Sequence, residues 1–270
     1  MVAEDATSLR RGIAILLALE AQEGLGAGPL GVTRIASLVG REKSQVSRSL
    51  KILAEYCLVD RDPETLGYRL GWRLLTMAGR STYATLLAAA DPLLKRLVRE
   101  LGERSHLSVP NGPEVLTVLS EAPDRTVQTA GWIGRSVPAY SSSSGRALLL
   151  DHDLPELEAL LGEVRFEPVT AATPRSVGEL HERIVAARKR GFAIVEEEFE
   201  AGLVAAAAPV RDFTGRIVAA VNVSAPKFRF AKELARAGKR VKAAADELSA
   251  ALGWEASPPT SIKTTSAAGG

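Results

Sequence analysis

Polar and basic residues recur on one side of a segment near the N-terminus, at spacings that suit contact with nucleic acid. If Val46, Leu50 and Leu53 face inward at the helical repeat, the residues that point outward or sideways are Ser44, Gln45, Ser47, Arg48 and Lys51. Arginine pairs with guanine, glutamine with adenine and serine with either base, and a helix N-terminus attracts phosphate. The pattern predicts a helix that reads base edges; the alternative is an ordinary solvated helix face.

A short helix before this segment and a hairpin after it complete the arrangement. Thr33 is expected to cap a short apolar helix that ends at Gly40, and residues 41–43 form a tight polar turn. Residues 58–70 alternate in character and contain Pro and Gly, which predicts a small β-hairpin, or wing, with two arginines. Two short helices joined by such a turn are typical of a helix-turn-helix. The predicted DNA-binding residues are Thr33, Ser44, Gln45, Ser47, Arg48, Lys51, Arg61 and Arg69.

The distribution of charge permits a polyanionic partner for this part of the chain. Residues 34–73 contain eight basic and five acidic residues, a net charge of +3, whereas all 270 residues together carry only +2. Cys57 stands where a helix often ends in glycine, and we expect a small buried residue rather than a redox sensor. The residues on the apolar face of an amphipathic helix that precedes this region are Leu9, Ile13, Leu16 and Leu17.

A second set of polar residues in the C-terminal half suits a small molecule. A run of four serines ends at Ser144, where hydroxyls and backbone N–H groups of Ser143, Ser144 and Gly145 meet the start of a helix, a place that favours an anion. Asn222 and Ser224 share one face of a strand otherwise rich in Ala and Val, and burying them is costly unless they are paired. These features predict a site for a small organic carboxylate. The alternative is that a serine only caps the helix and that Asn222 bonds a neighbouring backbone group.

Catalysis is the competing interpretation of the same half of the chain. Ser144 lacks the G-x-S-x-G context of an activated nucleophile, and nothing assigns His106 or His152 as its base. The carboxylates of residues 196–198 alternate between strand faces, so they form no general-acid pair and are expected to be solvated or to cap a turn. One cysteine and three scattered histidines exclude an internal disulfide and have no metal-ligand spacing. We therefore expect no enzyme, no metal and no cofactor.

The composition is that of an ordinary globular protein. With 46% hydrophobic and 24% charged residues, 270 residues suit about two domains. A helix is expected over residues 72–90, with a break at Asp91-Pro92, and strand and helix patterns then mix through residue 252, as in a sheet domain of the α/β or α+β class. No apolar run has the length of a membrane span, and the acidic N-terminus is unlike a signal peptide. We expect a cytoplasmic protein with no membrane contact.

Several motifs in the chain are more specific than its periodicities. They are Tyr68-Arg69-Leu70-Gly71 at the end of the wing, the Ser-Gly-Arg-Ala-Leu-Leu segment at residues 144–149, the spacing Gly191…Glu198…Gly202, Pro209-Val210-Arg211-Asp212 with Gly215, and Asn222-Val223-Ser224-Ala225-Pro226. From about Leu9 to Leu252 the chain resembles the IclR-type (isocitrate lyase regulator) family of bacterial transcription factors. The family often has Asp or Ser where this chain has Val195, so its effector is expected to differ from those of well-studied relatives.

The resemblance implies an α+β fold in which an N-terminal winged helix-turn-helix is joined by a linker helix to a GAF-like, antiparallel-sheet effector-binding domain. The implied parts are residues 1–71 for DNA binding, 72–91 for the linker helix, 92–253 for the effector domain and 254–270 for a disordered tail. By resemblance, the strand around Leu203 and Ala205 lines the effector pocket together with the serine run, Asn222 and Ser224.

The function implied is effector-responsive transcriptional regulation, with the chain acting as a repressor of a catabolic operon. Such proteins bind palindromic operators as homodimers or dimers of dimers. The linker helix is the expected dimer contact, through Leu75, Ala78, Leu86 and Leu87, unless these residues pack within the chain. A DNA-binding architectural protein without an effector is the second interpretation, and a small-molecule enzyme is the third.

Overall fold

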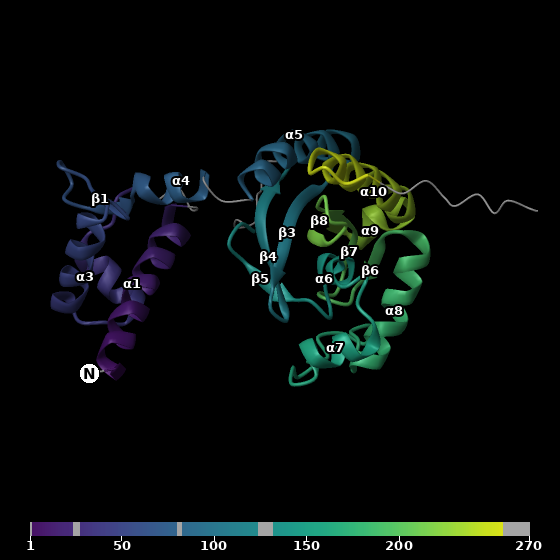
Figure 1. Cartoon of the computed structure of the whole chain (residues 1–270), viewed down its shortest axis with the longest axis horizontal. Coiled ribbons are helices and arrows are strands. Elements are labelled where there is room, and N and C mark those ends of the chain that lie inside the picture. The colour runs from purple at the N-terminus through teal and green to yellow at the C-terminus, as the bar shows by residue number, and fades with distance from the viewer. Residues whose placement is uncertain (1, 24–27, 80–82, 124–131, 256–270) are drawn as a thin grey trace, which may run out of the picture. The chain divides into compact units, whose positions relative to one another are not determined.

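The computed structural model describes residues 2–23, 28–79, 83–123 and 132–255 (Figure 1). The chain divides into two compact units, Met1–Leu107 with Leu116–Val137, and Ser108–Val115 with Pro138–Gly270. The disordered tail that the sequence predicts lies outside the described residues from residue 256 onward, and the predicted domain boundaries remain a prediction. Among the described residues, no helix is both long enough and apolar enough to span a membrane.

The first unit begins with a compact helical cluster and a two-stranded wing. Its elements are α1 (Val2–Glu23), α2 (Val32–Val39), α3 (Lys43–Glu55), β1 (Val59–Arg61), β2 (Tyr68–Leu70) and α4 (Trp72–Gly79). Ile15, Leu19, Ile35, Val46 and Leu50 form its buried core. The strands β1 and β2 pair antiparallel with Asp60 opposite Arg69, so the predicted wing is confirmed.

The prediction of which side of the first helix packs inward is wrong. Leu9, Ile13 and Leu17 are 68%, 48% and 57% exposed, whereas the buried side chains are those of Ile15 and Leu19. The helix carries apolar residues on nearly all sides over residues 13–19. Periodicity alone therefore does not select the side that packs against α2 and α3.

The predicted helix break at Asp91-Pro92 is also wrong. The helix α4 ends at Gly79, and α5 (Ala84–Leu101) runs through Pro92 without interruption. Proline removes one hydrogen bond within a helix, but the buried stripe of α5 continues on both sides of it. That stripe consists of Leu86, Ala90, Leu93, Leu94, Leu97 and Val98. Packing of these side chains outweighs the missing bond, because each buried aliphatic side chain contributes about 1.5–3 kcal/mol.

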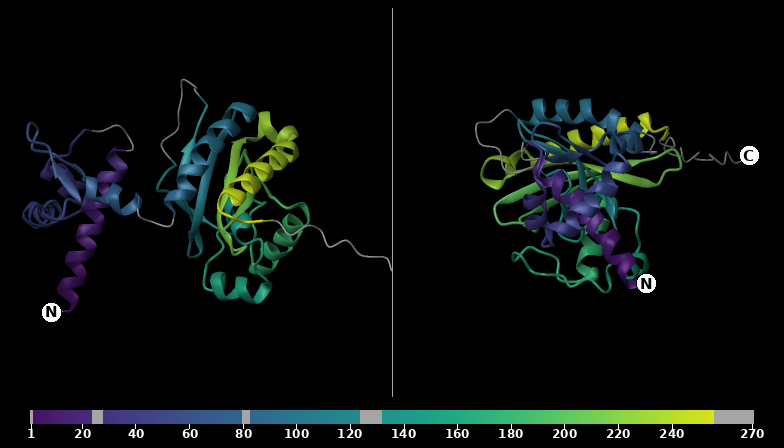
Figure 2. Two further views of the ribbon diagram at one scale, coloured as in Figure 1. Left: turned by 45° about the horizontal axis from the view of Figure 1, so that its top comes forward. Right: turned by 90° about the vertical axis from the view of Figure 1, so that its left-hand side faces the viewer.

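The rest of the chain forms a six-stranded sheet with helices around it, so the predicted α+β class is confirmed (Figures 1 and 2). The strands are β3 (Arg104–Asn111), β4 (Glu114–Glu121), β5 (Ser136–Pro138), β6 (Ala193–Glu196), β7 (Leu203–Arg211) and β8 (Ile217–Pro226), in the order β5-β4-β3-β8-β7-β6. The helices are α6 (Ser143–Leu148), α7 (Leu154–Leu161), α8 (Val177–Arg190), α9 (Lys227–Phe230) and α10 (Leu234–Ala251), with a 3-10 turn at Ala231–Glu233. Strand-like patterns in the sequence at residues 115–119, 192–195, 203–210 and 217–223 predict β4, β6, β7 and β8, whereas no such pattern predicts β3 or β5.

The strands β6, β7 and β8 of the second unit have two differently covered faces. Phe192 packs on Gly238 of α10, where a Cβ would lie 2.2 Å from the phenyl ring. This contact places α10 on the face that carries alternate β7 residues from Val204 to Val210. The helix α6 also contacts β6, β7 and β8, and Figure 1 shows it on the opposite side of these strands from α10. The face with Ala205 and Ala207 therefore lies toward α6.

Candidate DNA-binding and effector sites

The exposed face of α3 carries the residues predicted to read DNA. Ser44, Ser47, Arg48 and Lys51 are exposed and Gln45 is half-buried, while Val46 and Leu50 anchor the opposite face in the core. Among the described residues, none of these five polar side chains has a hydrogen bond or ion-pair partner. The helix therefore presents a row of donors that no described residue engages.

The wing holds its two arginines on the surface. Arg61 and Arg69 are both exposed, and the Arg61 Nε donates to the Leu66 carbonyl over 3.4 Å. The Asp62 carboxylate accepts bonds from the Thr65 N–H at 2.8 Å and from the Glu64 N–H at 3.1 Å, which closes the turn of the hairpin. These bonds lower the pKa of the Asp62 carboxyl, the Thr65 N–H first among them.

Two expectations at the ends of these helices are wrong. The residue that caps α2 is Gly31, without a side-chain bond, and Thr33 is an exposed residue of the first helical turn. Cys57 adopts a left-handed conformation with φ of 56° after α3, as expected of a position that favours glycine. Its side chain is exposed rather than buried, because the left-handed turn directs it away from the core.

The predicted effector residues of β7 and β8 lie on one face of the sheet. Ala205 is paired with Ser224 and Ala207 with Asn222, and Leu203 lies at the end of the same row, opposite Pro226. Asn222 is 9% exposed, and its Oδ1 atom has no hydrogen-bond partner among the described residues. A buried amide oxygen without a partner costs about 1–3 kcal/mol, so the face is better suited to a bound ligand than to dry packing.

The serine run reaches the same side of the sheet through α6. Ser143 and Ser144 are buried in the first turn of this helix, but the residue that caps it is Ser142, whose Oγ accepts from the Gly145 N–H at 3.1 Å. The Gly145 amide is thus occupied within the chain. A Cβ at Gly145 would lie 2.2 Å from the Ala139 carbonyl oxygen, so the glycine allows close packing and does not itself offer a group to an anion.

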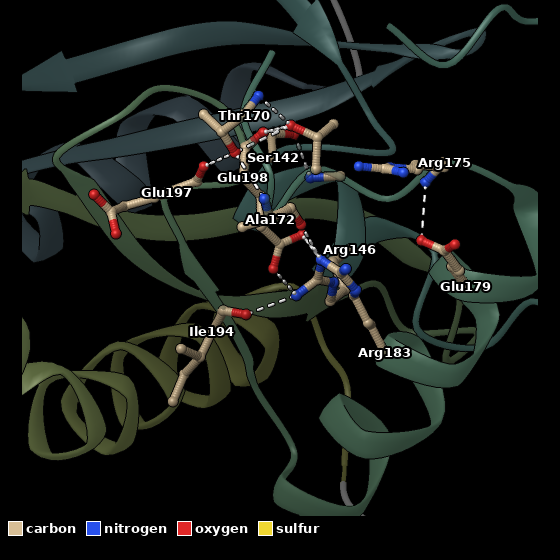
Figure 3. Close-up of polar contacts among 12 residues, drawn as sticks. Ser142, Arg146, Thr170, Ala172, Arg175, Glu179, Arg183, Ile194, Glu197 and Glu198 are labelled. Carbon is tan, nitrogen blue, oxygen red and sulfur yellow. Dashed lines mark hydrogen bonds and ion pairs between the residues drawn. The ribbon is translucent and has the colours of Figure 1, made fainter. Parts of the chain in front are cut away.

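A buried ionic network fixes α6 in place, and the sequence patterns do not predict it (Figure 3). The Arg146 guanidinium is 2% exposed and forms a two-pronged ion pair with Glu198, with Nη1 to Oε1 at 3.1 Å. Its Nη1 also donates to the Ile194 carbonyl at 2.7 Å. Arg183 of α8 approaches the same carboxylate, with Nη1 2.7 Å from Oε2. Burial lowers the pKa of the Arg146 guanidinium, and the bond to Glu198 opposes that shift.

The prediction that the carboxylates of residues 196–198 are solvated or cap a turn is therefore wrong for Glu198. Glu197 does cap a turn, since its carboxylate accepts from the Gly202 N–H at 2.9 Å and pairs with Lys227, and both contacts lower its pKa, Lys227 more strongly. Glu198, in contrast, is buried between α6 and α8. Arg146 and Glu198 both belong to the family motifs, but residues 52 positions apart are not paired by local spacing.

A winged helix-turn-helix joined to an antiparallel-sheet unit is the architecture of a class of transcriptional regulators. The family model described as "Bacterial transcriptional regulator IclR C-terminal" matches residues 81–250. The chain belongs to the IclR family. It is accordingly a DNA-binding transcriptional regulator and not an enzyme.

Individual relatives agree with this assignment. The chain is 30% identical to the regulator XynR of Escherichia coli K12 over 85% of its own length and 92% of that protein. It is 27% identical to the repressor AllR of the same strain over 94% and 93%. The crystal structure of an IclR homologue from Microbacterium hydrocarbonoxydans, in complex with 4-hydroxybenzoate, superposes with a TM-score of 0.75 at 21% identity, covering 91% of this chain and 98% of that one.

Proposed function

We propose that this chain represses a catabolic operon by binding a palindromic operator through α3 and the wing, and that a small organic acid switches its operator affinity. The polar row of Ser44, Gln45, Ser47, Arg48 and Lys51, which has no partner among the described residues, carries the DNA-binding part of the proposal. Thr33, Arg61 and Arg69 are assigned to contacts with the DNA backbone or the minor groove. Because its target is chromosomal DNA, the chain is assigned to the cytoplasm.

Substitutions in α3 test the reading helix. Arg48→Ala should lower operator affinity by about 1–3 kcal/mol and relax specificity at one base position, as expected when a guanine is no longer bound. Lys51→Ala should weaken binding evenly across sequences and reduce the salt dependence, as expected for a phosphate contact. Arg165→Ala, at an exposed arginine of the second unit, is the control and should bind like the parent. Parent-like binding by both α3 variants would exclude this helix as the reader.

The effector part of the proposal rests on the Asn222 Oδ1 atom, which has no partner among the described residues, and on the buried serines of α6, the helix that contacts β8. An asparagine amide offers both a donor and an acceptor, so it suits a carboxylate that also carries a hydroxyl. The solved relative that holds 4-hydroxybenzoate supports an acid of this kind as the effector. Ser143, Ser144 and Ser224 are assigned to further polar contacts, while Leu203 and Ala205 supply an apolar wall. Gly145 is assigned to the packing that shapes this site.

The double variant Ser144→Ala/Asn222→Leu tests the effector site. It should bind operator DNA normally but lose its response to the effector, which a fluorescence assay of operator release in the presence of hydroxylated aromatic and aliphatic acids would detect. Asn111→Leu, at the exposed end of β3, is the control and should respond like the parent. A double variant that still responds with unchanged ligand affinity would place the site elsewhere.

Assembly as a homodimer, or as a dimer of dimers, is assigned to the exposed apolar residues of the first unit. One winged helix-turn-helix covers half of a palindrome, so two copies are needed. Trp72, Leu75 and Met77 of α4 are 60–71% exposed. A groove of about 570 Å³ between the wing and α4 is lined by Asp60, Arg69, Leu70, Gly71, Trp72, Leu74 and Leu75. Leu86, also expected at this contact, is buried within the chain and is not assigned to it.

A further inference from the structure

Two stretches of the second unit together carry a larger excess of positive charge than the predicted DNA-binding region. Residues 188–190 read Arg-Lys-Arg, and residues 227–242 contain seven basic residues and one acidic residue, Glu233. Together these two stretches have a net charge of +9, against +3 for residues 34–73. Neither stretch contributes to the reading helix or to the effector face.

The two stretches meet on the surface. The end of α8 lies against α10, because a Cβ at Gly191 would be 2.8 Å from Lys242 Cε. Figure 1 shows the same end of α8 beside α9 and α10. On α10 the exposed residues Arg236, Lys239 and Arg240 recur at helical spacing and form one stripe. Lys239 precedes Lys242 by three residues, so it lies on the side of the stripe that borders α8. We call residues 188–190 with the basic residues of 227–242 the basic patch.

Neighbouring carboxylates neutralise only part of this charge. Lys242 pairs with Asp246 at 2.5 Å and Arg236 with Glu233 at 3.1 Å, and Lys227 pairs with Glu197. When Glu196, Glu197, Asp246 and Glu247 are counted, the net charge of the region is still +5. Four exposed side chains of the basic patch have neither an ion pair nor a side-chain hydrogen bond in the described part of the chain. They are Lys189, Arg190, Lys232 and Lys239.

We propose that the basic patch binds the phosphate backbone of double-stranded DNA, in addition to the contacts that α3 and the wing make. Exposed lysines and arginines without acidic partners are the groups that neutralise phosphates and release counterions. A symmetric dimer does not form through this surface, because two patches of the same sign would face and repel each other. The protein already brings DNA to itself, so a duplex is the polyanion that this surface meets at the highest concentration.

Charge removal in the full-length chain tests the proposal. Lys232→Gln/Lys239→Gln should reduce affinity for a long random-sequence duplex by about tenfold at 50 mM salt and lower the salt slope by about 0.9 for each phosphate that is no longer neutralised. Arg165→Gln/Arg216→Gln removes the same charge from exposed positions outside the patch and should bind like the parent. An equal reduction in both double variants would show an effect of net charge alone and overturn the proposal, as would parent-like binding by Lys232→Gln/Lys239→Gln.

Cross-linking provides a readout independent of α3. In a Cys57→Ser background, Lys239→Cys bearing a photoactivated cross-linker should capture the duplex, whereas Arg216→Cys with the same label should not. Capture at residue 239 should persist when Arg48→Ala weakens the reading helix, so a failure of the base-reading assignment and a failure of this proposal are distinguishable. Absence of duplex capture at residue 239, or its replacement by capture of an added acidic polypeptide, would overturn the proposal.

Discussion

At the scale of single residues, Glu198 is a buried carboxylate that joins α6 and α8 in the second unit. Its carboxylate compensates the buried Arg146 and also pairs with Arg183. Breaking a buried ion pair by removing one partner leaves the other charge without compensation in a medium of low dielectric, at a cost of about 3–5 kcal/mol. The network therefore holds α6 and its serines in position.

We expect Glu198→Gln to lower the free energy of unfolding by about 3 kcal/mol or more, because the amide keeps the shape of the side chain but not its charge. Urea unfolding followed by circular dichroism measures the change. Glu200→Gln, at an exposed position two residues away, should change stability by less than about 0.5 kcal/mol. A destabilisation in Glu198→Gln no larger than that of the control would show that the network contributes no stability.

His106 predicts a dependence of stability on pH. Burial, with a smaller effect of Arg104, lowers the pKa of this histidine to about 3. As pH falls below about 6.5, the unfolded chain therefore binds a proton that the folded chain does not, and stability falls by about 1.4 kcal/mol per pH unit. Above pH 6.5 both states are neutral and the residue contributes no slope.

His106→Gln removes the titrating group, so unfolding measured at pH 7, 6 and 5 should lose stability less steeply than in the parent. The slope is the readout, since the absolute stability of the variant also reflects changed packing beside the Trp132 ring, whose centroid lies 5.5 Å from that of His106. Identical slopes in the two proteins would contradict the assignment of the pH dependence to His106.

At the scale of elements, the position of α6 depends on close backbone contact at Gly145. Gly145→Ala would place a methyl group 2.2 Å from the Ala139 carbonyl oxygen, and the backbone must move to accept it. We expect a destabilisation of about 1–3 kcal/mol and a weaker response to the effector. Gly178→Ala, where α8 has room for a methyl group, should instead stabilise by up to about 1 kcal/mol. Thermal unfolding of the two variants measures the difference, and equal melting temperatures would contradict it.

At the scale of the whole molecule, the exposed apolar residues of α4 predict a concentration-dependent dimer. Leu75→Glu places a charge at a residue that is 60% exposed in the single chain, so the monomer should fold normally while the dimer dissociates. Light scattering at micromolar concentration should then show a monomer with weakened operator binding. Val169→Glu, at a residue of the second unit that is 61% exposed, should remain dimeric. A stable monomer in the parent itself would exclude the assembly.

The sequence by itself determined those features that depend only on residues close to one another along the chain. The wing, α3 with its buried Val46 and Leu50, the capping position of Cys57 and the strands β6 to β8 all follow from periodicity and turn chemistry. The row of Asn222 and Ser224 on one strand face follows from the alternation of a strand. The family resemblance extended these local patterns to a whole fold.

Only the tertiary structure decided which of several apolar sides turns inward and which distant charges meet. In α1, Ile15 and Leu19 are buried although Leu9, Ile13 and Leu17 form an equally regular row. The helix α5 passes through Pro92 because buried leucines on both sides of it contribute more than the missing hydrogen bond costs. The pairing of Arg146 with Glu198 and the meeting of α8 with α10 join segments about 50 residues apart. Local propensity carries no information about such contacts, because their free energy arises only when the chain closes on itself.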